Sequence, residues 1–153
     1  MPVLEEIIKT KPIEDMHMRA YLNIMYTGNW ISNRVNQALK PFDLTEQQYN
    51  VLRILRGQHG ETMSLFEIQD RMIQKMSNVS RLIDKLLQKG LVERKECKMN
   101  RRKVDIRITD AGLAVVNDAE APIQANFNEM ARNFTAEEAK IIAGLLDQLR
   151  NNL

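Results

Sequence analysis

Hydrophobic residues recur every three to four positions along most of this chain, which is the spacing of amphipathic helices. A stretch without proline covers residues 13–39 and stops before Pro41, so it predicts a long first helix. Three later helix starts carry a capping box, in which a hydroxyl residue is followed three positions on by Glu or Gln, at Thr45, Ser64 and Thr135. Helical signals therefore dominate the pattern.

Two short helices are predicted on either side of residues 73–76, an arrangement typical of the helix-turn-helix. The first begins at Ser64, and the second begins at residues 76–78 and ends at Gly90, since glycine tolerates the left-handed conformation of a helix end. Residues predicted to turn inward are Leu65, Ile68 and Met72 in the first helix, and Val79, Leu82, Ile83 and Leu86 in the second.

The hydrophobic period changes from 3.6 to 2 after Gly90. Residues 91–94 and 104–108 are predicted strands, and the polar, basic loop between them predicts a β-hairpin with a cationic tip. A helix capped by Thr109 follows, with a kink or break expected at Pro122. Its predicted inward residues are Val116, Ala119, Ile123, Phe127 and Met130. The expected fold is mainly α with a small β-hairpin wing: four helices, two strands and two helices.

Charge is distributed unevenly along the chain, although the net charge is only +2. Residues 71–103 hold 11 Lys or Arg and 3 Asp or Glu, and the rest of the chain is net acidic. A basic block on an acidic body is typical of a surface that binds a polyanion. A solvated, lysine-rich surface is the alternative.

The polar front of the second helix in the pair has residue types that read DNA. The major groove admits one α-helix, Asn can bind adenine through two hydrogen bonds, and Arg can bind guanine in the same way. The hairpin tip is long enough to enter an adjacent minor groove, where Arg is well suited. The candidate DNA contacts are Ser77, Asn78, Ser80, Arg81, Lys85, Lys98, Asn100, Arg101, Arg102 and Lys103. An ordinary solvated helix and a charged, solubilising turn are the alternatives.

Residues 77–86, 89–94 and 100–112 together resemble the MarR family of bacterial regulators. The resemblance spans nearly the whole chain. It implies an obligate homodimer made by the terminal helices, one winged helix-turn-helix per subunit, and a palindromic operator. It also implies that many relatives respond to small aromatic or phenolic ligands, or to oxidants. Asn100 departs from the family pattern, which has Asp there, so a charged hydrogen bond to the wing arginine is lost.

The chain is expected to form a single MarR-like unit over residues 1–153. Residues 41–109 are the expected winged helix-turn-helix DNA-binding region. The expected helical dimerisation region comprises residues 1–40 and 110–153, because a single copy of the DNA-binding region cannot fully bury their apolar stripes. Tyr21, Met25 and Trp30 crowd the first helix, and they are interpreted either as core or dimer packing or as the wall of a ligand cleft.

Several classes of function lack support in the sequence. No phosphate-binding glycine loop, nucleophile motif or metal-ligand spacing occurs, so neither an enzyme nor a cofactor is expected. No apolar run approaches 18 residues, and no secretory signal precedes the chain's helices. Cys97 is the single cysteine, which fits the cytoplasm, and a redox role for it stays open.

The sequence therefore predicts a cytoplasmic, sequence-specific regulator of transcription that binds double-stranded DNA as a homodimer. A repressor that binds a palindromic operator and is gated by a small apolar or phenolic effector is the favoured form. The alternative is a nonspecific architectural DNA-binding protein, which would depend on phosphate contacts alone. Asn78 and Arg81 on the exposed face argue for reading of sequence.

Overall fold

The computed structural model describes residues 2–74, 78–96 and 104–151. Its elements are α1 (Leu4–Ile7), α2 (Met16–Leu39), the 3-10 helix η1 (Lys40–Phe42), α3 (Glu46–Arg56), β1 (Met63–Ser64), α4 (Leu65–Arg71), α5 (Val79–Gln88), β2 (Val92–Glu96), β3 (Val104–Ile108), α6 (Asp110–Ala131) and α7 (Ala136–Arg150). The predicted fold, mainly α with a small β wing, is confirmed.

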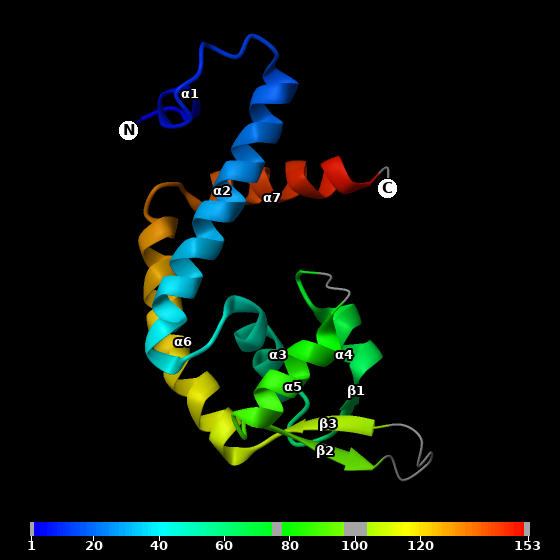
Figure 1. Ribbon diagram of the computed structural model, residues 1–153. Coiled ribbons are helices and arrows are strands. Elements are labelled where there is room, and N and C mark those ends of the chain that lie inside the picture. Colours follow the sequence, from blue (N-terminus) through cyan, green and yellow to red (C-terminus); the bar gives the residue numbers. More distant parts are fainter. Residues whose placement is uncertain (1, 75–77, 97–103, 152–153) are drawn as a thin grey trace.

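Figure 1 shows a compact lobe, formed by α3 to β3, below a helical rod in which α2 and α6 lie side by side. α7 follows α6 and crosses α2 in this view, whereas α1 lies at the end of α2 far from the lobe. None of the helices in the described part of the chain is both long enough and apolar enough to cross a membrane.

One hydrophobic core fills the compact lobe and extends to the nearest ends of α2 and α6. The predicted stripe of α5 is buried, and Ile68 and Met72 are buried on α4. The rod contributes Leu39, Val116 and Ala119 to this core, and each of them has no exposed surface. Burying a side chain such as Leu or Ile stabilises a fold by about 1.5–3 kcal/mol, so this cluster holds the helix pair and the rod ends together.

The helix starts follow the sequence prediction. Capping boxes form at Thr45, Ser64 and Thr135, and each hydroxyl accepts a hydrogen bond from the backbone N–H three residues on. The Thr109 hydroxyl accepts from Gly112 N at 3.1 Å and donates to the carbonyl of Gly90 at 2.7 Å. Gly90 has a φ of 68°, as expected of the residue that ends a helix. Thr109 therefore fixes the start of α6 against the end of α5.

Three antiparallel strands form the sheet in the order β1-β3-β2. β2 pairs with β3 so that Val92 lies opposite Ile108 and Arg94 lies opposite Ile106. β1 pairs with the other edge of β3, with Met63 opposite Ile106. The hairpin was predicted, although its first strand covers Val92–Glu96 rather than residues 91–94. The short strand β1 was not predicted. β1 connects the hairpin directly to the start of α4.

Some expectations about single elements are wrong. The break that was one of the two alternatives expected at Pro122 does not occur, because this residue lies within α6. Leu65 and Phe127 are 36% and 57% exposed rather than inward. Leu65 opens α4 at the edge of the lobe. Phe127 lies beyond Ala119, the last buried residue of α6, on a part of the helix that is outside the core. The short helix α1 was also not predicted, and the Glu5 carboxylate holds it to Arg19 of α2 at 2.6 Å.

Large apolar side chains remain exposed on the rod. Those on α2 and α7 are Met16, Met18, Tyr21, Ile24, Met25, Tyr26, Trp30, Ile31, Ile141, Ile142, Leu145 and Leu149. No described residue of α7 is buried. Exposed apolar surface of this extent is typical of an interaction surface.

Candidate nucleic-acid interface

α5 presents a polar face to solvent because its apolar face is fixed in the core of the compact lobe. Ser80, Arg81 and Lys85 are exposed on this face, and Asn78 immediately precedes the helix. The Asn78 side chain makes no capping hydrogen bond. Among the described residues, neither Arg81 nor Lys85 has an ion-pair partner, so both cations are available to an external anion.

An ion pair fixes α5 to the wing. Arg94 on β2 donates a hydrogen bond from Nη2 to Asp84 Oδ1 on α5 at 2.6 Å. The sequence analysis predicted a strand that ends at Arg94 but did not predict this pair. The alternation along β2 offered a signal, because Arg94 lies opposite the buried Ile106 and therefore on the strand face that packs on the lobe. The pair fixes the wing strands relative to α5.

A second group of charges lies on the other face of the hairpin. Arg107 on β3 lies opposite Glu93 on β2, and its Nε and Nη2 donate to Glu93 Oε1 at 2.9 and 2.6 Å. Lys95 Nζ lies 3.2 Å from the other carboxylate oxygen of Glu93. The hydrogen bond from Arg107, followed by that from Lys95, lowers the pKa of Glu93 below its usual value. Glu93 therefore stays ionised and braces both strands below the hairpin loop.

Part of the predicted contact set lies outside the described residues. These residues are Ser77, Lys98, Asn100, Arg101, Arg102 and Lys103. Cys97, for which a redox role was left open, also lies outside the described residues. The structure brings Asn78, Ser80, Arg81 and Lys85 together on one helix face, and β2 and β3 lead to the loop that carries the others. The helix half of the predicted set therefore forms one surface.

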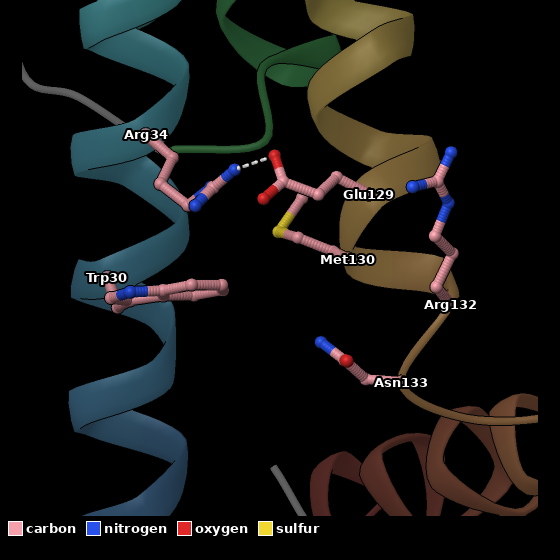
Figure 2. A pocket seen from close by; sticks show the side chains of 6 residues that line it. All are labelled: Trp30, Arg34, Glu129, Met130, Arg132 and Asn133. Carbon is pink, nitrogen blue, oxygen red and sulfur yellow. Dashed lines mark hydrogen bonds and ion pairs between the residues drawn. The ribbon is translucent and has the colours of Figure 1, made fainter. Parts of the chain in front are cut away.

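The three predicted ligand residues all lie on α2, and Trp30 lines a depression between α2 and the end of α6. Figure 2 shows the Trp30 ring and Arg34 facing Glu129 and Met130 across this depression. The Arg34 guanidinium carbon lies 5.1 Å from the centre of the Trp30 ring, and its Nη2 lies 2.5 Å from Glu129 Oε2. Tyr21 and Met25 are exposed elsewhere on α2.

No group of three or more His, Cys, Asp or Glu side chains in the described ranges is placed to hold a metal ion. The chemistry offered by α5 is that of hydrogen-bond donors and free cations on a rigid helix. Such a face binds the base edges and phosphates of a duplex. A helix pair followed by a β-hairpin, which β1 completes to a three-stranded sheet, with this face exposed, defines a winged-helix DNA-binding protein.

Comparisons with known proteins agree with this class. The MarR family model matches residues 44–104. A MarR transcription factor from Planctomyces limnophilus shares 32% sequence identity, with a TM-score of 0.68, over 90% of this chain and 99% of that chain. The chain belongs to the MarR family and is a transcriptional regulator.

Two more distant structures show the same fold. A cysteine-to-serine mutant of MarR from E. coli, crystallised with operator DNA, has 23% identity and a TM-score of 0.78, over 98% of this chain and 99% of that chain. An organohalide-sensing transcriptional regulator in its 2,4-dichlorophenol-bound form has 18% identity and a TM-score of 0.82, over 99% of this chain and 89% of that chain.

Proposed function

We propose that this regulator binds a palindromic operator in double-stranded DNA as a homodimer and represses transcription. The observation that carries the proposal is the face of α5, where Arg81 and Lys85 are exposed and unpaired among the described residues while the opposite face is buried. A helix fixed in this way can enter the major groove without rearrangement of its own core. In the proposed complex, Asn78, Ser80 and Arg81 read base edges, and Lys85 binds phosphate.

The hairpin supplies the second contact in this proposal. Its loop carries Lys98, Arg101, Arg102 and Lys103, with Asn100 beside them, and Ser77 opens the recognition segment. We assign the arginines to the adjacent minor groove, where a narrow A·T-rich groove concentrates negative potential. The ion pair between Asp84 and Arg94 supports this arrangement, because it connects β2 of the hairpin directly to α5.

The proposed dimer is formed by residues 1–40 and 110–153, and residues 41–109 bind DNA. Exposed apolar side chains on α2 and α7 support this division. Two-fold symmetry would place the two α5 helices about 34 Å apart, which is one turn of DNA. The operator is therefore expected to be an inverted repeat with half-site centres about 10 base pairs apart.

A small apolar or phenolic effector is proposed to gate DNA binding from the rod. The depression at Trp30 supports this, because it combines an aromatic ring, the thioether of Met130 and the polar side chains of Arg34 and Arg132. The organohalide-sensing regulator of the same fold was crystallised with 2,4-dichlorophenol. An effector changes the DNA affinity only if it binds one spacing of the two α5 helices better than the other.

Selection of bound sequences from a random duplex pool tests this function. An inverted repeat should be enriched, and it should compete for binding far better than scrambled DNA of the same length. Equal competition by both duplexes would instead favour an architectural DNA-binding protein, and the proposal would then be withdrawn. A panel of chlorinated and unsubstituted phenols, added to the same assay, tests the effector.

A further inference from the structure

Hydrogen bonds connect α2 to the N-terminus of α3. The Ser32 hydroxyl on α2 donates to Glu46 Oε2. One turn further along α2, Asn36 Oδ1 accepts from the backbone N–H of Glu46 at 2.9 Å, while its Nδ2 donates to the Ser32 carbonyl at 2.9 Å. Ser32, Asn36 and Glu46 are all partly buried. The first residue of α3 is thus held to the rod through both its backbone and its side chain.

The same end of α3 holds the segment that leads to α5. Gln74 Nε2 donates to Glu46 Oε2 at 3.2 Å, and Gln74 Oε1 accepts from Gln47 Nε2 at 2.7 Å. One turn along α3, Asn50 Oδ1 accepts from the backbone N–H of Ile73 at 3.1 Å. Residues 73 and 74 are therefore fixed by three side chains of α3.

Glu46 Oε2 is the shared atom of the two halves of this network. It accepts from Ser32 on the rod and from Gln74, which lies four residues before Asn78 at the start of α5. Hydrogen bonds to an ionised carboxylate are roughly twice as strong as neutral ones. Met72 anchors the same segment in the core, where it is 2% exposed, while the Gln74 side chain binds the N-terminal end of α3.

We propose that Glu46 is a positioning residue that couples α2 to the recognition helix: the position of α2 sets the position of the N-terminal end of α5 through Ser32, Glu46 and Gln74. This inference rests on the proposed function, because it treats α5 as the helix that reads DNA. The coupling gives the rod a direct connection to the DNA-reading residues, separate from the hydrophobic core.

A double-mutant cycle on Ser32→Ala and Gln74→Ala tests the coupling. The two side chains bond to one carboxylate oxygen and not to each other, so any dependence between them passes through Glu46. Each single variant is expected to lower operator affinity about threefold to tenfold, with less effect on scrambled DNA. The double variant should lose less operator affinity than the product of the two single-variant fold-losses. In a Glu46→Ala background, both substitutions should lose their effect on affinity.

Two further variants separate positioning from folding. Glu46→Gln keeps an acceptor oxygen at the same place, so it should retain most of the operator affinity that Glu46→Ala loses. Gln124→Ala is the matched control: it removes an exposed amide that donates to Asn128 at 2.9 Å on α6, and it should leave operator affinity unchanged. Melting temperatures are measured for all variants, and those of Gln74→Ala and Gln124→Ala should remain close to the parent value.

Hydrogen exchange of the backbone amides at residues 79–88 provides a readout that needs no operator. Gln74→Ala should accelerate exchange in the first turn of α5, while Gln124→Ala should not. If the parent selects no operator, the proposed function fails, and this exchange result alone decides the coupling. In the other outcome, the parent discriminates operator from scrambled DNA while the double variant loses operator affinity by the full product of the two single-variant factors. That result overturns the coupling and leaves the proposed function standing.

Discussion

Arg81 is the residue on which the proposed reading of DNA sequence depends most directly. It is exposed on α5 and, among the described residues, has no ion-pair partner. Replacing Arg81 by Ala should cost about 1–3 kcal/mol on the operator, because a guanidinium that binds a base edge is lost. The loss on scrambled DNA should be smaller. Binding measured across a salt series on both duplexes separates base reading from phosphate contact, since each lost phosphate contact lowers the salt slope by about 0.9.

Lys11→Ala is the control for this measurement. Lys11 is also an exposed cation without an ion-pair partner among the described residues, but it lies between α1 and α2, outside the compact lobe. Removing its charge should change neither the affinity for operator nor the melting temperature. If Arg81→Ala binds both duplexes as the parent does at every salt concentration, α5 does not dock as proposed.

Gly112 is required by close packing where α6 begins. A Cβ atom added there would lie 2.1 Å from the Leu91 carbonyl oxygen and 2.8 Å from Ile108 Cγ1. Gly112→Ala should destabilise the fold by about 1–3 kcal/mol, because backbone must shift to make room. Urea unfolding measures this. Gly57→Ala is the control, since Gly57 has a φ of −64° and its added Cβ would make ordinary contacts; an equal loss of stability in both variants would contradict the packing explanation.

At the scale of elements, an arginine joins α3 to α6. Arg56 Nη1 donates to Glu120 Oε2 and to Asn117 Oδ1, each at 2.8 Å, and Nη2 donates to Glu120 Oε1 at 3.2 Å. The hydrogen bond from Arg56 lowers the pKa of Glu120 below the usual 4.5. The stabilisation from this pair is therefore fully present above pH 4.5 and is lost as the pH falls through the lowered pKa of Glu120.

Glu120→Gln tests this pH dependence. The melting temperature of the parent should fall as the pH drops below 4.5, and that of the variant should fall less steeply. The effect is expected to be small, because Glu120 is about half exposed and water screens the pair. Glu14→Gln is the control, since this exposed carboxylate has no ion-pair partner among the residues that the structure describes. Identical curves for parent and Glu120→Gln would show that the pair does not stabilise the junction of α3 and α6.

Local patterns predicted the helices well because their information lies within a few residues. The capping boxes and the α5 stripe depend on spacings of three and four, and both are confirmed. β1 could not be predicted, because a two-residue strand has no period and exists only through pairing with β3, more than forty residues later. The Asp84–Arg94 pair depends in the same way on how β2 packs against α5. The ligand residues on α2 were grouped by sequence proximity, whereas the depression at Trp30 is completed by α6.

At the scale of the whole molecule, the compact lobe has a buried hydrophobic core, whereas the rest of the rod has exposed apolar side chains. Nearly all buried residues lie in the compact lobe or at the ends of α2 and α6 nearest to it. Helical periodicity predicts which face of α7 is apolar but not what covers it. The uncovered face of α7 and the exposed side chains of α2 therefore belong to the same surface in the proposed dimer, and this surface makes the clearest prediction about assembly.

Leu145→Glu should prevent that assembly. Leu145 is 61% exposed on α7 with Leu149 one turn further along the same face, at 64%. In the proposed dimer both are buried against the partner, so a carboxylate at position 145 would be desolvated without a cation to compensate it. Light scattering at micromolar concentration should give twice the 17.8 kDa chain mass for the parent and a single chain mass for the variant. The variant should also bind the operator more weakly than the parent, because a monomer binds only one half-site.

Ala143→Glu distinguishes loss of the dimer from general damage to α7. Ala143 is exposed and lies two residues from Leu145, on nearly the opposite side of the helix. The same charge placed there should leave the dimer and operator binding intact. Far-ultraviolet circular dichroism should give the same helical signal for both variants. If the parent is a stable, folded monomer, or if Leu145→Glu remains a dimer with parental operator affinity, the exposed apolar face of α7 is not the surface that joins two copies of this chain.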